Sequence, residues 1–104
     1  MQVFIIDPSA KEIKALDIPE TQEALAQAIG FTTIDSDEID DNGDRLFFDE
    51  ECFIRLQSNV GRFKIDSLAP VAGVGIIVNS PDGGKTLQSA IVNLADLEKR
   101  VTFL

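Results

Sequence analysis

The sequence contains no histidine, tyrosine or tryptophan. Histidine is the commonest general acid–base near neutral pH and the usual activator of a nucleophilic serine or cysteine. A pair of carboxylates can hydrolyse a glycosidic bond, but that chemistry also needs a sizeable cleft and aromatic side chains that stack on sugars. The chain has only seven phenylalanines, and a core of this size needs most of them. We therefore expect no enzymatic activity, no catalytic residues and no cofactor.

Cysteine is almost absent. Cys52 is the single one, so no disulfide can form within the chain. Glu50 and Glu51 precede it, and nearby negative charge disfavours the reactive thiolate. Phe53 and Ile54 follow it. We predict that Cys52 is a small buried or half-buried hydrophobic residue and not a nucleophile.

Long apolar runs are missing as well. No segment approaches the ~20 consecutive apolar residues that a membrane-spanning helix needs. The opening MQVFIIDPSA has no lysine or arginine before its apolar residues, which is unlike a secretory signal. We expect a soluble, cytoplasmic protein with no membrane partner.

Basic residues are few: nine lysines and arginines stand against 18 acidic residues, for a formal net charge of −9. Direct binding to nucleic acid needs a basic surface, so we do not expect it here. What the chain does have is an ordinary globular composition, 44% hydrophobic and 26% charged over 104 residues. We therefore expect one domain that spans residues 1–104.

The first third of the sequence predicts a hairpin and a helix. β-branched and aromatic residues over 2–6, and alternating polarity over 12–16, indicate two strands paired with each other. Asp17 with Glu20 three residues later resembles a capping box, which would begin a helix there. Gly30 is typical of a residue that ends one.

The middle of the sequence predicts further strands. Residues 31–34 begin a strand that runs into an acidic stretch, and 45–48 return as its partner across a turn at 41–44, where Asn-Gly favours a tight hairpin. Alternation predicts another strand over 62–65. The apolar run 71–78 is the best candidate for a central strand. Its glycines, Gly73 and Gly75, indicate a bulge or a close approach of the backbone to another group.

The C-terminal segment predicts a short helix. Asn93 followed by Asp96 is a capping signal, and Lys99 and Arg100 lie where the helix dipole favours cations. The segment 52–59 fits either a strand or a helical turn. Together these elements predict an α+β fold, with a mostly antiparallel sheet built from hairpins, one helix after the second strand and a short C-terminal helix.

The excess charge is concentrated in one stretch. Residues 35–51, DSDEIDDNGDRLFFDEE, hold nine acidic residues and one basic residue. We expect two strand ends and a turn with carboxylates crowded at the tip, forming an acidic face that attracts a basic protein. The alternative is a solvated hairpin whose charges only keep edge strands from pairing. The predicted acidic face comprises Asp35, Asp37, Glu38, Asp40, Asp41, Asp44, Asp49, Glu50 and Glu51.

A second hypothesis for this stretch is a calcium or other divalent-cation site. When Gly43 is set at the obligatory glycine of an EF-hand loop, Glu38, Asp40, Asn42 and Asp49 fall on four of its ligand positions. The frame is defective, because its first ligand is glutamate, its last is the shorter aspartate, and its flanks read as strands and not as helices.

The segment GGKT at 83–86 invites a phosphate-loop interpretation. That motif needs a glycine where this chain has Asn79, and Pro81 lies between that position and GGKT. A plain turn explains it better.

Several stretches together resemble a family of small single-domain proteins of unknown function, encoded by bacterial phages, plasmids and integrated mobile elements. These stretches are the opening strand that ends in Asp-Pro, the helix ETQEALAQAIG, the DNG turn, RFKID, AGVGIIV, SPDGG and the closing LADLEKRVTFL. The resemblance would cover nearly the whole chain, and it brings no catalytic residues with it. It implies a cytoplasmic accessory protein of a mobile element, and by analogy a partial DNA mimic directed at a basic, nucleic-acid-binding protein.

Overall fold

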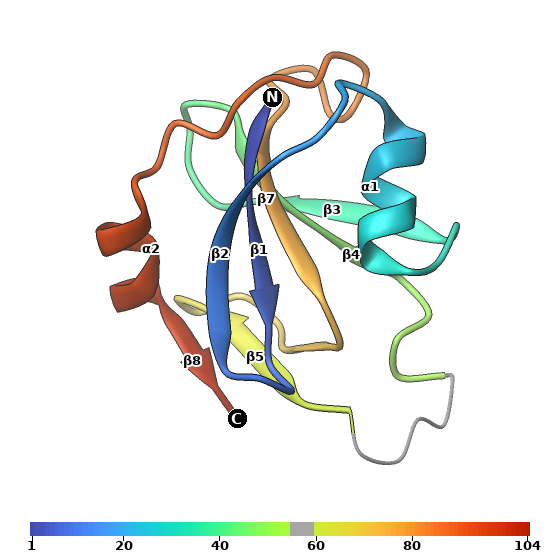
Figure 1. The fold of residues 1–104 in the computed structure, drawn as a ribbon. Coiled ribbons are helices and arrows are strands. Elements are labelled where there is room, and N and C mark those ends of the chain that lie inside the picture. Colours follow the sequence, from blue (N-terminus) through green and yellow to red (C-terminus); the bar gives the residue numbers. More distant parts are fainter. Residues whose placement is uncertain (55–59) are drawn as a thin grey trace.

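The computed structural model describes residues 1–54 and 60–104, which form eight strands and two helices. Most consecutive elements are joined by short turns, and the strands belong to two sheets (Figure 1). The strands are β1 (Gln2–Asp7), β2 (Glu12–Asp17), β3 (Ile34–Glu38), β4 (Asp44–Asp49), β5 (Arg62–Ile65), β6 (Val71–Ala72), β7 (Gly75–Asn79) and β8 (Val101–Phe103), and the helices are α1 (Gln22–Ile29) and α2 (Leu94–Arg100).

The strands form two antiparallel sheets. The larger has the order β2-β1-β7-β4-β3 and the smaller has the order β6-β5-β8. The predicted α+β class, the antiparallel pairing, the helix after the second strand and the short C-terminal helix are confirmed. The hairpin β1–β2 and the strands at 45–48 and 62–65 also form where the sequence predicts them.

The two faces of the larger sheet bury different elements, because successive side chains of a strand point to opposite faces. One face packs against α1 through Leu25 and Ile29. The other packs against the smaller sheet and α2, through Phe63 and Leu97 among others. The core thus has two layers, one on each side of the larger sheet. Cys52 is buried in the second layer, as its apolar neighbours predict.

The apolar run 71–78 is not one strand. It breaks at Gly73, whose φ of 87° is a left-handed conformation, and its two halves join different sheets as β6 and β7. β7 is the central strand that the run predicts. Gly75 on β7 makes a close approach, because a Cβ atom there would lie 2.5 Å from the Phe63 ring.

The start of the first helix differs from the capping-box prediction. The N-cap is Thr21, whose side chain accepts a hydrogen bond from the Ala24 backbone N–H, so Asp17 belongs to β2 and Glu20 precedes the helix. Pro19 lies between them and carries no N–H to donate, and the chain turns there before the helix begins. Gly30 ends the helix in a left-handed conformation, as predicted.

Two further boundaries were predicted only in part. The strand expected to begin at 31–34 begins at Ile34. Asn93 caps α2 as predicted, but the chain then continues directly into β8, a strand that the sequence pattern did not reveal. The open prediction for 52–59 falls mostly on residues 55–59, which lie outside the described residues.

Substitution of Gly75 by alanine should lower the free energy of unfolding by about 1–3 kcal/mol through overpacking. The new methyl carbon would lie 2.5 Å from Phe63 Cζ and 2.9 Å from Leu46 Cδ1, and both side chains are fully buried. Urea denaturation measures the change. In a Phe63→Leu background the same substitution should be milder, because the ring atoms are gone. An equal loss in both backgrounds would contradict steric contact between the sheets as the cause.

Candidate functional site in the acidic hairpin

β3 and β4 form the predicted hairpin, with Ile34 opposite Asp49 and Glu38 opposite Arg45. The turn between them is shaped by two residues. The Asn42 side-chain oxygen accepts a hydrogen bond from the Asp44 backbone N–H at 3.0 Å. Gly43 has φ 98°, which favours glycine. The Asn-Gly signal therefore gives a turn, as the sequence predicts.

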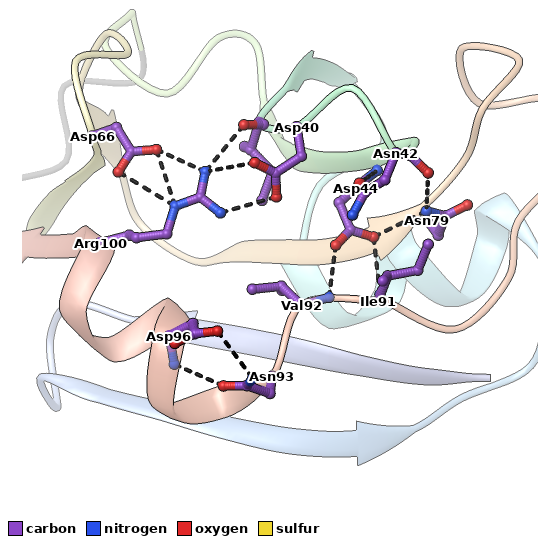
Figure 2. Close-up of polar contacts among 11 residues, drawn as sticks. Asp40, Asn42, Asp44, Asp66, Asn79, Ile91, Val92, Asn93, Asp96 and Arg100 are labelled. Atoms are coloured by element: carbon purple, nitrogen blue, oxygen red, sulfur yellow. Dashed lines mark hydrogen bonds and ion pairs between the residues drawn. The ribbon is translucent and has the colours of Figure 1, made fainter.

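Asp44 does not lie on the surface. Its side chain is fully buried and accepts three hydrogen bonds, from Asn79 Nδ2 at 3.0 Å, the Ile91 N–H at 3.0 Å and the Val92 N–H at 2.8 Å (Figure 2). Asn79 Nδ2 also donates to the Asn42 carbonyl at 3.0 Å. A buried carboxylate needs such donors. Asp44 thus ties the start of β4 to β7 and to the segment before α2.

Asp49 is buried too, at 3% exposure. Its carboxylate accepts a hydrogen bond from the Thr33 hydroxyl at 2.6 Å and another from the Glu51 backbone N–H at 3.2 Å. Asp44 and Asp49 were both part of the predicted acidic face. The structure removes them from it, because side chains without solvent exposure cannot contact a partner.

Asp40 is exposed only in part and is neutralised by a residue from the far end of the chain. Figure 2 shows the Arg100 guanidinium between Asp40 and Asp66, with ion-pair distances of 2.9 Å and 2.7 Å. Arg100 also donates to the Ile39 carbonyl at 3.0 Å. Hydrogen bonds to Asp66 and then Asp40 raise the pKa of Arg100 above its ordinary value. This cluster joins the hairpin turn to α2 and to the end of β5.

Glu38 has a basic neighbour within the hairpin. Its carboxylate lies 3.3 Å from Arg45 Nη1. Arg45 reaches across β3 and also donates to the Ser36 hydroxyl at 2.9 Å and to the Ser36 backbone carbonyl at 3.3 Å. The Glu38 side chain remains 73% exposed, so its charge still faces solvent.

Four carboxylates of the predicted face are exposed and have no basic partner in the part of the chain that the structure describes: Asp35, Asp37, Asp41 and Glu50. Asp35 and Asp37 lie on the same side of β3, which is the outer strand of its sheet. Glu51 is half-buried and is engaged by a neighbour. The acidic surface that remains, with Glu38 included, is smaller than the sequence predicts.

The structure does not gather the four candidate calcium ligands. Glu38 lies at the turn end of the hairpin, whereas Asp49 lies opposite Ile34 at its other end, four strand residues away or about 13 Å. Asp49 and Asp40 already have other partners. Within residues 1–54 and 60–104, no group of three or more acidic or thiol side chains is placed to hold a metal ion.

The GGKT segment lies in a loop that is closed by the side chains of Ser80 and Asp82, just before it. The Ser80 hydroxyl accepts from the Gly84 N–H at 2.7 Å, and the Asp82 carboxylate accepts from the Thr86 N–H at 2.7 Å. These two amides are therefore already paired and are not available to a phosphate. A hydrogen bond from the Thr86 side chain, and to a smaller extent one from the Thr86 backbone, lower the pKa of Asp82 below its ordinary value.

A hollow of about 510 Å³ lies at the end of α1. Of the residues that line it, only Glu23 is ionisable, so no acid–base pair converges there. Its lining consists of Glu23, Ala26, Gln27, Gly30, Phe31 and Thr32.

Sequence reasoning missed the roles of Asp44 and Arg100. Their partners lie 47 and 48 residues away for the backbone of Ile91 and Val92, and 60 residues away for Asp40. No spacing rule links residues so distant. One signal was available. Asp44 follows the turn glycine and lies two residues before the first residue of LFF, and residues two apart on a strand face the same side, so the Asp44 side chain is expected to face the sheet interior.

Comparisons with protein-family models, curated proteins and solved structures find no match to this chain. None of the helices among the described residues is long and apolar enough to cross a membrane.

Replacing Asp44 with alanine should lower the free energy of unfolding by about 2 kcal/mol or more, because the buried Asn79 amide and the part-buried N–H groups of Ile91 and Val92 lose their acceptor. The control is Asp41→Ala, which removes the same charge from an exposed side chain and should change stability by less than about 0.5 kcal/mol. Chemical denaturation of both variants measures the difference. Similar stabilities would show that the buried carboxylate does not hold the hairpin.

Replacing Thr86 with valine should raise the pKa of Asp82 toward its ordinary value, because the valine cannot donate from its side chain. The shift should be partial, since the backbone N–H of residue 86 still donates. Carboxyl-carbon NMR titration of Asp82 measures it. In the parent protein, the loop contacts of Asp82 should persist at neutral pH and be lost as the pH falls through its lowered pKa. An unchanged titration would refute the role of the hydroxyl.

Proposed function

We propose that this chain is a non-enzymatic accessory protein whose exposed hairpin carboxylates bind a basic protein. The supporting observation is the pair Asp35 and Asp37, which lie exposed on one side of the outer strand β3 without a basic partner among the described residues. Asp41 at the turn adds a further exposed carboxylate, and Glu38, which alternation turns to the other face of β3 beside Arg45, adds charge at the end of the strand. We call these four residues the acidic edge.

The spacing of the acidic edge suits an electrostatic contact. Alternate residues of a strand project on the same side about 6.8 Å apart, so Asp35 and Asp37 form a short row of negative charge. That distance is below the Debye length of about 8 Å at physiological salt, so the charges act together. The summed field attracts a cationic surface and speeds its approach.

The edge favours recognition by charge over recognition by strand addition. At the two ends of the β3–β4 ladder, Thr33 is hydrogen-bonded to Glu50 and Ile39 is hydrogen-bonded to Asp44. Pairs alternate, so the backbone of Ser36 points away from β4. Arg45 already donates to the Ser36 carbonyl, which blocks a hydrogen bond from an added strand.

The partner class follows from this chemistry. A basic groove that normally holds phosphates would accept a short row of carboxylates, so a nucleic-acid-binding protein is the proposed partner and the acidic edge is a partial DNA mimic. Because the row is short and Asp44, Asp49 and Asp40 do not contribute, the mimicry is restricted to one edge. The resemblance to proteins of phages and plasmids supports a role in the cytoplasm of a bacterium that carries such an element.

The test is a triple variant of the acidic edge, Asp35→Asn, Asp37→Asn and Asp41→Asn. Immobilised parent protein is expected to retain a basic, nucleic-acid-binding protein from bacterial lysate at low salt and to release it at high salt. The variant should bind the purified partner about tenfold more weakly or worse at low salt, because the attraction is mainly electrostatic. Added double-stranded DNA should compete with the parent protein.

A matched control removes three charges elsewhere: Asp17→Asn, Glu20→Gln and Glu23→Gln, all on exposed side chains. The control should keep its affinity. Equal weakening of both variants would indicate an effect of net charge alone. Binding that does not change with salt concentration, or with the acidic-edge substitutions, would contradict the proposal.

A further inference from the structure

The opposite edge of the larger sheet has different properties. β2 is its other outer strand and, among the residues that the structure describes, pairs only with β1. Met1 and Ile18 exchange two backbone hydrogen bonds, of 2.8 and 3.0 Å, which fixes the alternation of the β1–β2 ladder. Hydrogen-bonded pairs then recur at every second residue, so the N–H and C=O groups of Ile13, Ala15 and Asp17 point away from the sheet.

Within the part of the chain that the structure describes, no side chain covers the outward backbone groups of this edge, as one does in part on β3. No hydrogen bond within residues 1–54 and 60–104 engages the outward backbone groups of Ile13 or Ala15, whereas Arg45 covers the Ser36 carbonyl on the other edge. β2 also has no proline within its six residues. An open edge of this kind is a template for another strand.

The charges of β2 are self-complementary about Ile13. We propose that a second copy of this chain pairs with β2 in antiparallel register, with Ile13 opposite Ile13 across a two-fold axis. That register places Glu12 of each copy opposite Lys14 of the other, which gives two ion pairs. Within one chain the Glu12 and Lys14 side chains form an ion pair of 3.1 Å, but they are 50% and 72% exposed and can therefore also contact a second copy.

Neighbouring registers lack this match. Centring the pair on Lys14 would set two lysines directly opposite each other, which is destabilising. Centring it on Ala15 would place Lys14 opposite Leu16 and form no ion pair. Since register in a sheet edge is set by side-chain pairing, the charges select Ile13 as the centre.

A hollow beside this edge provides room for the second copy. It measures about 460 Å³ and is lined by residues of β2 and β8, with Ile13, Val101 and Phe103 as its apolar part, and by Glu98 of α2. Residues directly opposite in antiparallel strands project on the same face. Ile13 of the second copy therefore enters this hollow, and the reciprocal contact forms by symmetry.

The assembly would be a continuous ten-stranded sheet with one acidic edge at each far end. The dimer uses a surface distinct from the acidic edge, so its test does not depend on the proposed function. One hydrogen-bonded residue pair and two ion pairs make a small interface, and we expect a weak dimer that forms at high protein concentration.

Charge reversal at two positions tests the dimer by sedimentation equilibrium. Lys14→Glu alone and Glu12→Lys alone each turn two attractive pairs into two repulsive ones, and each should raise the dissociation constant about tenfold or more. An equimolar mixture of the two variants should form heterodimers, because each chain then supplies the opposite charges. The double variant Glu12→Lys, Lys14→Glu should recover the affinity of the parent.

The control is Lys85→Glu, which makes the same charge change on an exposed loop and should leave association unchanged. Circular dichroism of every variant checks that it is folded. A parent protein that stays monomeric up to about 1 mM overturns the proposal. A dimer that is indifferent to both charge reversals, or a mixture that fails to associate, overturns it as well.

Discussion

The arrangement of the hairpin depends on the hydrogen bonds that the buried Asp44 carboxylate accepts. The carboxylate lies where β4 leaves the turn, and it accepts from Asn79 on β7 and from two amides of the segment before α2. An ion buried in this way is stable only while all its donors are in place. The turn, the central strand and the approach to the C-terminal helix are therefore held by one side chain, in the layer of the core that lies between the two sheets.

The same constraint separates structural from exposed carboxylates. Along β4 the alternation of the strand turns Asp44 inward, and Thr33 and Glu51 engage Asp49 at its other end. Arg100 compensates Asp40 from α2. Within residues 35–51, the exposed carboxylates that no cation of the described chain pairs with are on the outer strand β3, in the turn and at Glu50. A stretch that reads as one acidic block in the sequence is thus divided by folding into anchors and an exposed row.

The two edges of the larger sheet differ in a way that suits separate roles. β3 carries a row of negative charge, and Arg45 blocks part of its backbone, which suits contact through side chains. β2 leaves its backbone open and has opposite charges on either side of Ile13, which suits pairing with an identical strand. The proposed basic partner and the proposed second copy would therefore occupy opposite ends of the sheet.

Local signals in the sequence determined much of the fold: alternation predicted the strands at 12–16 and 62–65, Asn-Gly predicted the hairpin turn, and Asn93 predicted the cap of α2. They failed where distant residues compete. The capping-box signal at Asp17 lost to pairing of that residue with Gln2, and the apolar run 71–78 was divided because Phe63 and Val71 draw β6 into a second sheet. The concentration of acidic residues in 35–51 is evident from the sequence alone. Which carboxylates face water was decided only by tertiary contacts, because Ile91, Val92 and Arg100 reach the hairpin from dozens of residues away.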